Sequence, residues 1–209
     1  MPDSTPIVFV VDDDISVRES LESLIRCEGW QPETFASAQA FLDHPRAFTP
    51  SCLILDVGLP DLNGLELQKR IAADRKDLPI IFITGHGDVP MTVKAMKGGA
   101  AEFLTKPFAD EALLSAVRHS IERSHLALRR EAEIKTLRDR YALLTPRERD
   151  VLSLIVAGMS NKLAGAAMGV SEITVKAHRG KVMQKMQADS LPGLVKMAVR
   201  LRLTPVRSA

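Results

Sequence analysis

The sequence predicts an α/β domain built on a doubly wound, five-stranded parallel sheet, followed by a smaller all-α domain. Two observations support this prediction. In the first part of the chain, five short strand candidates alternate with helical patterns, and four of the candidates contain an apolar run, which is typical of strands buried on both faces of a parallel sheet. In the last part, successive segments begin with capping residues and carry apolar side chains at helical spacing, which predicts several short helices.

The five expected strands lie at residues 7–11, 31–35, 52–55, 80–83 and 102–105. Helical patterns between them cover residues 16–28, 64–73 and 90–97. Gly29 is expected to end the first of these helices. This alternation predicts a doubly wound sheet, for which we expect the flavodoxin-like strand order 2-1-3-4-5. No glycine-rich phosphate fingerprint follows the first strand, which disfavours a dinucleotide-binding fold.

The composition is that of a soluble globular protein able to bury one or two cores, with 209 residues, 45% hydrophobic and 26% charged. No apolar run approaches the roughly 20 residues that span a bilayer, and no signal-peptide pattern is seen, so we expect a cytoplasmic protein. Cys27 and Cys52 lack the spacing of a metal-binding pair. We expect both to be small, buried or half-buried hydrophobic side chains.

The nearly balanced net charge of +2 conceals an asymmetry along the chain. Residues 1–120 contain 18 acidic and 11 basic side chains, residues 121–140 contain 4 and 6, and residues 141–209 contain 4 and 11. An acidic first part that can hold a metal ion is therefore joined to a basic last part that can hold a polyanion. Nucleic acid is the leading candidate for that polyanion.

Polar side chains follow four of the predicted strands, at the point where each strand ends. They are Asp12, Asp13 and Asp14, then Asp56, Thr84 and Lys106. Open parallel sheets place their chemistry just beyond the carboxyl ends of the strands, so these side chains should converge on one pocket. Carboxylates with a hydroxyl and an ammonium group suit a hard divalent cation and a phosphoryl group.

The expected strand order assigns a role to each of these residues. Strand 3 lies between strands 1 and 4, about 4.8 Å from each, which makes Asp56 the central nucleophile. Asp13 would hold Mg²⁺, Thr84 would hydrogen-bond one phosphoryl oxygen, and the long side chain of Lys106 would reach another. A solvated turn is the alternative interpretation of three successive aspartates, and the matching polar positions at the other strand ends argue against it.

Four stretches of the first 125 residues resemble the receiver domain of two-component response regulators. They are VDDD (residues 11–14), LDVGLPDLNG (55–64), ITGHGD (83–88) and FLTKPF (103–108). The resemblance implies that Asp56 accepts a phosphoryl group from a phosphohistidine of a sensor histidine kinase. It also implies that Asp13, Asp56 and the carbonyl group of Gly58 ligate Mg²⁺ (or Mn²⁺), with Asp12 acting through a water molecule.

The same resemblance implies a cis bond between Lys106 and Pro107, which an X-Pro peptide tolerates. It also makes Thr84 and Phe103 a switch pair, in which the hydroxyl moves toward the phosphoryl group and the aromatic ring turns inward. A simple core position is the alternative for Phe103.

The resemblance is incomplete at Gly58, where many relatives carry Arg or Met. Together with His86 across the pocket, this position borders the path of a hydrolytic water, so the lifetime of the phosphoryl group cannot be transferred from the family. His86 could act as a general base, but we favour an exposed loop histidine without a catalytic role.

A helical segment is expected to connect the two domains. Leu113, Val117 and Ile121 form an i, i+4 stripe that should pack on the sheet. A further apolar repeat follows at spacings of 3, 4 and 3, consisting of Ile134, Leu137, Tyr141 and Leu144. This repeat could form a short coiled-coil seam between two chains or lie on a solvated helical spacer, and the sequence leaves both open.

Three helix starts are evident in the basic part. Thr145-Pro-Arg-Glu148 is a capping box that should begin a helix ending near Gly158. The side chains expected to be buried on it are Val151, Leu152, Leu154 and Ile155. Ser160 should cap a short helix ending at Gly169, and Ser171 should cap a helix that runs to about Met186. Two helices joined by a turn with glycine, on a basic background, predict a helix-turn-helix.

A helical projection of the last of these helices places Val175, Val182 and Met186 on the buried face. The opposite face carries Ile173, Ala177, Gly180 and Gln184, with Lys176 and Lys181 beside it. Small residues would let this helix sit deep in the DNA major groove, with Lys176 reaching base acceptors and Lys181 a phosphate. An ordinary solvated helix would more often carry Glu and Lys pairs on this face, which has no acid after Glu172.

Residues 141–205 resemble the DNA-binding domain of LuxR or NarL/FixJ type, through LTPRER (144–149), SNK (160–162) and VSEITVKAH (170–178). The resemblance implies that Lys176, Ala177 and Gly180 read bases. It also implies that four residues contact phosphates, namely Asn161, Lys162, Thr174 and Lys181. Leu163 stands where relatives usually have Glu and cannot complete a capping box, which predicts some fraying, and Leu191-Pro-Gly193 begins the last helix unusually.

Both domains together resemble the FixJ subfamily of response regulators. We expect a receiver domain at residues 1–123, a helical linker at 124–141 and a DNA-binding domain at 142–209. This arrangement implies a transcriptional regulator, not an enzyme, in which phosphorylation promotes dimerisation and binding to a near-palindromic operator. A sensor kinase, DNA, RNA polymerase and a second copy of the chain are the expected partners. A phosphorylation-independent DNA-binding protein and a phosphoryl relay are the alternatives.

Overall fold

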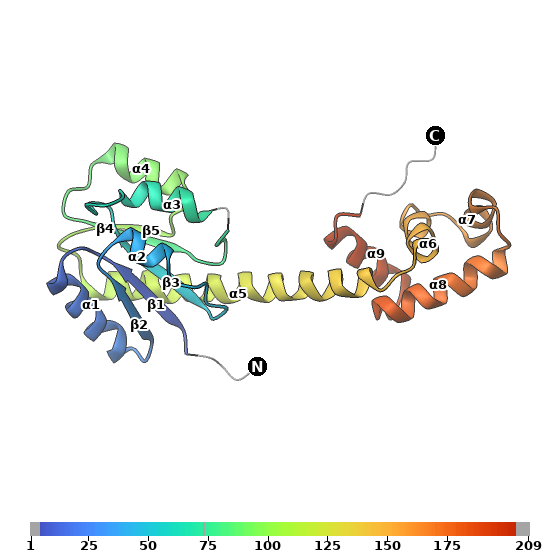
Figure 1. The fold of residues 1–209 in the computed structure, drawn as a ribbon, viewed down its shortest axis with the longest axis horizontal. Helices are drawn as coiled ribbons and strands as arrows, with labels where there is room; N and C mark the ends of the chain where they lie inside the picture. Colours follow the sequence, from blue (N-terminus) through green and yellow to red (C-terminus); the bar gives the residue numbers. More distant parts are fainter. Residues whose placement is uncertain (1–4, 73, 204–209) are drawn as a thin grey trace. The chain divides into compact units, whose positions relative to one another are not determined.

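The computed structural model describes residues 5–72 and 74–203 (Figure 1). The chain divides into two compact units, Met1–Arg129 and Arg130–Ala209. Within the described residues, no helix is both long enough and apolar enough to span a bilayer. The predicted combination of an α/β domain with a helical domain is confirmed. The domain limits expected near residues 123 and 141 remain a prediction.

The first unit contains one parallel sheet with the strand order β2-β1-β3-β4-β5, as predicted. The strands are β1 (Ile7–Val11), β2 (Gln31–Phe35), β3 (Ser51–Asp56), β4 (Ile80–Thr84) and β5 (Glu102–Thr105). Each of the apolar runs in the sequence therefore forms a strand. Because all strands point the same way, the residues that follow them gather at one edge of the sheet.

Helices cover both faces of this sheet (Figure 1). One face packs against α2 (Ala38–Leu42), α3 (Gly64–Ala72) and α4 (Val89–Lys97). The other packs against α1 (Ile15–Cys27) and the first part of α5 (Asp110–Ala142). Alternate residues of a strand serve the two cores, with Phe9 in the first and Val10 in the second.

Two details of the first unit differ from the sequence prediction. The sequence pattern does not predict helix α2, because five residues are too few to display a helical period. Ser37 nevertheless caps this helix by accepting a hydrogen bond from the backbone N–H of Ala40. Cys52 is buried in β3, but Cys27 at the end of α1 is exposed, so the expectation that both cysteines are shielded is wrong for Cys27. At Gly29 the backbone has φ +78°, which ends α1 as expected.

The linker region forms part of one continuous 33-residue helix, α5. Leu113 and Val117 are fully buried against the sheet and Ile121 is partly buried, as predicted. The second apolar repeat, which begins at Ile134, ends at Tyr141 and Leu144, and these two side chains pack in the hydrophobic core of the second unit. The end of the repeat is therefore used within the chain itself, which neither of the two sequence interpretations included.

The second unit contains α6 (Pro146–Val156), α7 (Asn161–Met168), α8 (Glu172–Met186) and α9 (Leu191–Arg200). Their caps explain where they begin: Thr145, Ser160 and Ser171 act as predicted. The start of α9 is regular, because Ser190 accepts a hydrogen bond from the backbone N–H of Gly193 at 3.2 Å. Leu154, expected to be buried, is only partly buried.

Candidate functional site

The carboxyl ends of β1, β3 and β5 bring two aspartates to one lysine. The Nζ atom of Lys106 lies 2.7 Å from Oδ2 of Asp12 and 3.1 Å from Oδ1 of Asp56. Asp12 and Asp56 are buried, with 1% and 8% of their surface exposed, and Lys106 is partly buried. We call the place where these three side chains meet the strand-end site. The strand-end rule therefore places these three residues correctly, although their positions in the chain are far apart.

The charge of Lys106 is stabilised by these contacts. Burial lowers the pKa of its ammonium group, but the hydrogen bonds and negative charges of Asp12 and Asp56 outweigh burial and raise the pKa above its ordinary value. Lys106 is thus a permanent cation at neutral pH. It is placed to attract any anion that comes close to Asp56.

The backbone after β3 also contacts the Asp56 carboxylate. The N–H group of Gly58 donates a hydrogen bond to Oδ2 of Asp56 at 2.5 Å. A Cβ atom at position 58 would lie 3.1 Å from the same oxygen. Any side chain introduced at position 58 would therefore lie next to the carboxylate of Asp56, and the glycine leaves this side of the carboxylate open.

The three successive aspartates have different environments. Asp12 contacts Lys106 through Oδ2, and its Oδ1 atom accepts a hydrogen bond from the backbone N–H of Asp14 at 2.9 Å. Asp14 caps α1 by accepting from the N–H and the hydroxyl of Ser16, which lowers the pKa of its carboxyl. Asp13 is exposed, and its side chain makes no hydrogen bond to other residues that the structure describes.

The hydroxyl of Thr84, at the end of β4, is engaged by its own loop. It accepts a hydrogen bond from the N–H of His86 at 3.2 Å and donates to the carbonyl oxygen of His86 at 3.3 Å. Phe103 on β5 is partly buried, and its ring centroid lies 6.2 Å from that of Phe82. His86 itself is exposed, as favoured from the sequence.

Gly87 connects the two members of the expected switch pair. A Cβ atom at this position would lie 3.1 Å from the ring of Phe103, 3.3 Å from Cγ2 of Thr84 and 2.7 Å from Cγ2 of Thr105. Only a glycine lets the loop pass this closely over both residues. The peptide bond between Lys106 and Pro107 is cis, as the resemblance implied.

The second unit presents the outward face of α8 as the helical projection predicted. Val175, Val182 and Met186 are fully buried. The residues on the opposite face are exposed, namely Ile173, Ala177, Gly180 and Gln184, and so are Lys176 and Lys181. No atom lies within 4 Å of a Cβ built at Gly180, so this face is open at its centre.

The residues expected to contact phosphates occupy different environments. Lys162 and Lys181 are exposed, whereas Thr174 is partly buried and its hydroxyl lies 2.9 Å from that of Ser171. Oδ1 of Asn161 accepts a hydrogen bond from Arg179 at 3.3 Å, which leaves its amide N–H groups as donors.

Comparison with known families agrees with this geometry. Residues 8–118 match the family described as response regulator receiver domain, and residues 142–198 match bacterial regulatory proteins of the luxR family. The chain belongs to the response regulators. Members of this type are transcriptional regulators, a non-enzymatic class, in which phosphorylation of the receiver domain is the standard mode of control.

Two relatives resemble this response regulator over nearly its whole length. Nodulation protein W of Bradyrhizobium diazoefficiens is 47% identical over 95% of this chain and 87% of its own. Transcriptional regulatory protein FixJ of Azorhizobium caulinodans is 44% identical over 100% and 99%. Both similarities include the receiver and the luxR-type regions, so the combination of domains is shared.

Solved structures show the same resemblance. The response regulator StyR is 44% identical, with a TM-score of 0.83 over 94% of this chain and 100% of that one. Full-length FixJ from B. japonicum is 41% identical, with a TM-score of 0.57 over 96% and 99%.

The strand-end site of this response regulator fits a hard divalent cation by its donor chemistry. Within the described residues, no group of three or more His, Cys, Asp or Glu side chains is arranged to hold a metal ion. Mg²⁺, however, needs only one or two carboxylates and completes its shell with water and phosphate oxygens. Asp12 and Asp56 already converge on the single cation of Lys106, so both carboxylates face a position suited to positive charge.

Two contacts near the predicted sites of this response regulator were not found from the sequence. Arg18 on α1 donates a hydrogen bond to the carbonyl oxygen of Asp12 at 2.6 Å, which fixes the acidic turn. Arg179 connects α8 to Asn161 on α7. Neither arginine belongs to an apolar period or a capping pattern, and no sequence signal would have indicated them.

Proposed function

We propose that Asp56 is the phosphoryl acceptor of this transcriptional response regulator. One carboxylate oxygen of Asp56 attacks the phosphorus of a phosphohistidine on a sensor histidine kinase. A P–O bond forms as the P–N bond breaks, and the electron pair leaves with the imidazole. The support is the position of the carboxylate, which lies at the end of β3 and accepts hydrogen bonds from Lys106 and from the N–H group of Gly58.

The proposed metal site consists of Asp13, Asp56 and the carbonyl group of Gly58, with Asp12 acting through a water molecule. Mg²⁺ or Mn²⁺ bound there would offset the negative charges that otherwise keep an anionic donor away from a carboxylate. Lys106 would exchange its contact with Asp56 for an oxygen of the phosphoryl group. Its raised pKa keeps it charged for this exchange.

The proposed switch begins at Thr84. Its hydroxyl would leave the backbone of His86 and donate to a phosphoryl oxygen, and the loop containing Gly87 would move with it. Because Gly87 lies directly over Phe103, a movement of this loop would allow the ring to turn inward. The surface formed by α4, β5 and α5 would then change shape.

We further propose that this altered surface forms a dimer. Three apolar side chains of α4 are exposed at helical spacing, Val89, Val93 and Met96, and they offer an apolar contact for a second copy. A dimer would place two copies of α8 on the half-sites of a near-palindromic operator. Base contacts are assigned to Lys176, Ala177 and Gly180, and phosphate contacts to Asn161, Lys162, Thr174 and Lys181. Control of transcription through RNA polymerase completes the proposal.

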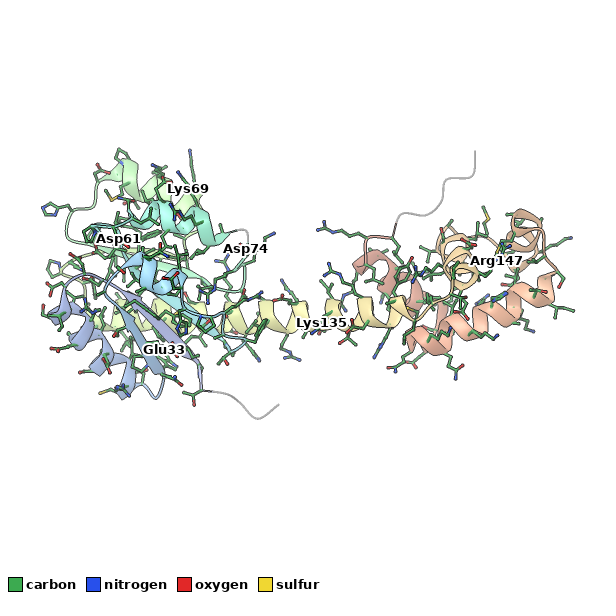
Figure 2. The ribbon with its side chains drawn as sticks, in the orientation of Figure 1. Glu33, Asp61, Lys69, Asp74, Lys135 and Arg147 are labelled. Atoms are coloured by element: carbon green, nitrogen blue, oxygen red, sulfur yellow. The ribbon has the colours of Figure 1, made fainter. Side chains whose placement is uncertain are left out.

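A labelling experiment with matched variants tests the phosphoryl acceptor. Wild-type protein, Asp56→Asn and Asp74→Asn are incubated with radiolabelled acetyl phosphate and Mg²⁺. Asp74 is an exposed aspartate on the loop after α3, away from the strand ends, and serves as the control (Figure 2). We expect wild type and Asp74→Asn to be labelled and Asp56→Asn to remain unlabelled. Equal labelling of Asp56→Asn would refute the assignment.

A DNA-binding measurement tests the coupling. The full chain is used to select duplexes from a randomised library, and binding to the selected duplex is titrated against salt with and without acetyl phosphate. We expect a steep salt dependence from phosphate contacts and tighter binding after phosphorylation, lost in Asp56→Asn. Salt-sensitive binding without any gain would favour phosphorylation-independent regulation, and labelling without DNA binding would favour a phosphoryl relay.

A further inference from the structure

Ile173 is an apolar side chain that is exposed to solvent on the outward face of α8, the face expected to contact DNA. It is the second residue of α8 and is 81% exposed, the highest value among the large hydrophobic side chains that are exposed in the described residues. An isoleucine in a folded domain is usually buried. Apolar side chains that are exposed singly are common on protein surfaces, so exposure alone implies no partner. Ile173 is distinguished by its place in the first turn of α8, on the face opposite the buried Val175, Val182 and Met186.

The surroundings of Ile173 argue against a protein partner. The other exposed residues on this face are small or polar, with Ala177 and Gly180 at i+4 and i+7 and Lys176 beside them. Large apolar patches mark many protein interfaces, whereas on this face of α8 one branched side chain stands among cationic and small neighbours. Such a surface suits a polyanion that offers an isolated apolar group.

Duplex DNA has this character. In the major groove, three of the four bases present only polar edges, and thymine alone adds a 5-methyl group. The N-terminal residues of a recognition helix are those that reach base edges, and Ile173 lies in the first turn of α8. A β-branched side chain in a helix is also nearly fixed at χ1, so its methyl groups are already placed for contact.

We propose that Ile173 reads thymine in each operator half-site by apolar contact with the 5-methyl group. This inference rests on the proposed function, because it requires α8 to enter the major groove. It adds a specificity determinant to the positions Lys176, Ala177 and Gly180. Lysine at 176 supplies a polar contact to base acceptors, and isoleucine at 173 supplies the apolar contact that a lysine cannot make.

The test removes one methyl group at a time from the DNA. A duplex is selected from a randomised library by the wild-type full chain, and each thymine of a half-site is replaced in turn by deoxyuridine. For wild type, the replacement at one particular thymine of the half-site should weaken binding about fourfold, which is the ratio expected when one methyl-sized group is no longer buried. Ile173→Ala should bind the thymine duplex more weakly and should not distinguish thymine from deoxyuridine at that position.

Two further variants complete the design. Ile173→Val keeps a branched apolar side chain and should retain the sensitivity to the methyl group. Val199→Ala removes an apolar side chain on α9 that is 65% exposed, and should behave as wild type. Circular dichroism should show unchanged helix content in all variants, because neither side chain belongs to a hydrophobic core.

The possible failures can be told apart. If the wild-type chain selects no DNA, the proposed function fails and the inference fails with it. If it selects DNA but no deoxyuridine replacement distinguishes wild type from Ile173→Ala, DNA binding stands and the assignment of Ile173 is overturned. An equal loss in both proteins at every thymine would also overturn the assignment, since the methyl effect would then arise elsewhere.

Discussion

Oδ1 of Asp56 lies 3.1 Å from Nζ of Lys106, so an ion pair connects the end of β3 to the residue that follows β5. The same ammonium group lies 2.7 Å from the fully buried Asp12. Two carboxylates thus share one cation. A divalent cation that binds these carboxylates must compete with Lys106, whereas a phosphoryl group that binds beside Asp56 can pair with the ammonium group of Lys106.

The first prediction concerns Lys106→Met, which keeps the length of the side chain and removes its charge. Without bound metal, the variant should be less stable by roughly 1–3 kcal/mol, because Asp12 loses its partner in a site that remains partly open to solvent. Mg²⁺ should bind more tightly, because a competing positive charge is gone. Isothermal titration calorimetry gives the affinity and urea unfolding followed by Trp30 fluorescence gives the stability.

Lys69→Met is the control for this prediction. Lys69 forms an exposed pair with Glu66 on α3 at 2.7 Å, and its replacement should change neither quantity appreciably (Figure 2). Weaker Mg²⁺ binding in Lys106→Met than in wild type would contradict the view that Lys106 and the metal ion compete for the same carboxylates.

The second prediction separates phosphorylation from its consequence. Thr84→Ala should still be labelled by acetyl phosphate, because Asp56 and Lys106 are unchanged. In wild type, phosphorylation should increase the DNA affinity by a factor typical of such coupling, about 5–150-fold, and in Thr84→Ala this factor should fall close to one. Thr84→Ser keeps the hydroxyl that now contacts His86 and should preserve most of the gain. A gel-shift titration of each phosphorylated variant measures this ratio, and a full gain in Thr84→Ala would exclude the hydroxyl from the switch.

The third prediction concerns the acid stability of the second unit. Hydrogen bonds from Lys185 and from the backbone of Thr145, together with the charge of Lys185, lower the pKa of Glu148 from 4.5 to about 2. A carboxyl group with a depressed pKa stabilises the folded state fully above pH 4.5. This contribution is lost as the pH falls from 4.5 to about 2.

Glu148→Gln should therefore unfold at a lower temperature than wild type at pH 7, and the difference should shrink as the pH approaches 2. Calorimetry of the full chain measures this, with Trp30 fluorescence identifying the transition of the first unit. Glu172→Gln, at an exposed position in the first turn of α8, is the control and should show no comparable pH dependence. A difference that stays constant from pH 7 to pH 2 would rule out the ion pair as its source.

The sequence was sufficient for much of this fold because its strongest signals are local. The central strands β1, β3 and β4 are short apolar runs, and each helix of the second unit starts at a capping residue, such as Thr145 or Ser160. The strand-end rule then converts a one-dimensional order into a pocket. It brought Asp12, Asp56 and Lys106 together without any knowledge of side-chain geometry.

What the sequence could not provide are contacts without a period or a motif. The capping role of Glu148 was evident, but its pairing with Lys185 on another helix was not. The contact of Arg18 with a backbone carbonyl depends on the path of the chain after β1. Tyr141 was expected either in a seam between chains or on a solvated spacer, yet it packs against the core of the second unit, because an apolar repeat does not reveal which surface will cover it.

The last prediction compares two buried serines one helical turn apart on α5. Ser124 is fully buried and accepts a hydrogen bond from the backbone N–H of Ser51, at the start of β3, at 3.0 Å. Ser120 is equally buried, yet its hydroxyl has no hydrogen-bond partner among the residues that the structure describes.

Replacing Ser124 by alanine should destabilise the first unit by about 1–3 kcal/mol, because the N–H group of Ser51 would be left buried and unpaired. Replacing Ser120 by alanine should be neutral or stabilising, because an unpaired hydroxyl is removed from the interior. The two substitutions delete the same atom from the same helix, so a difference between them isolates the hydrogen bond. Urea unfolding followed by Trp30 fluorescence measures both, and equal destabilisation would mean that packing, not the bond to β3, holds this part of α5 on the sheet.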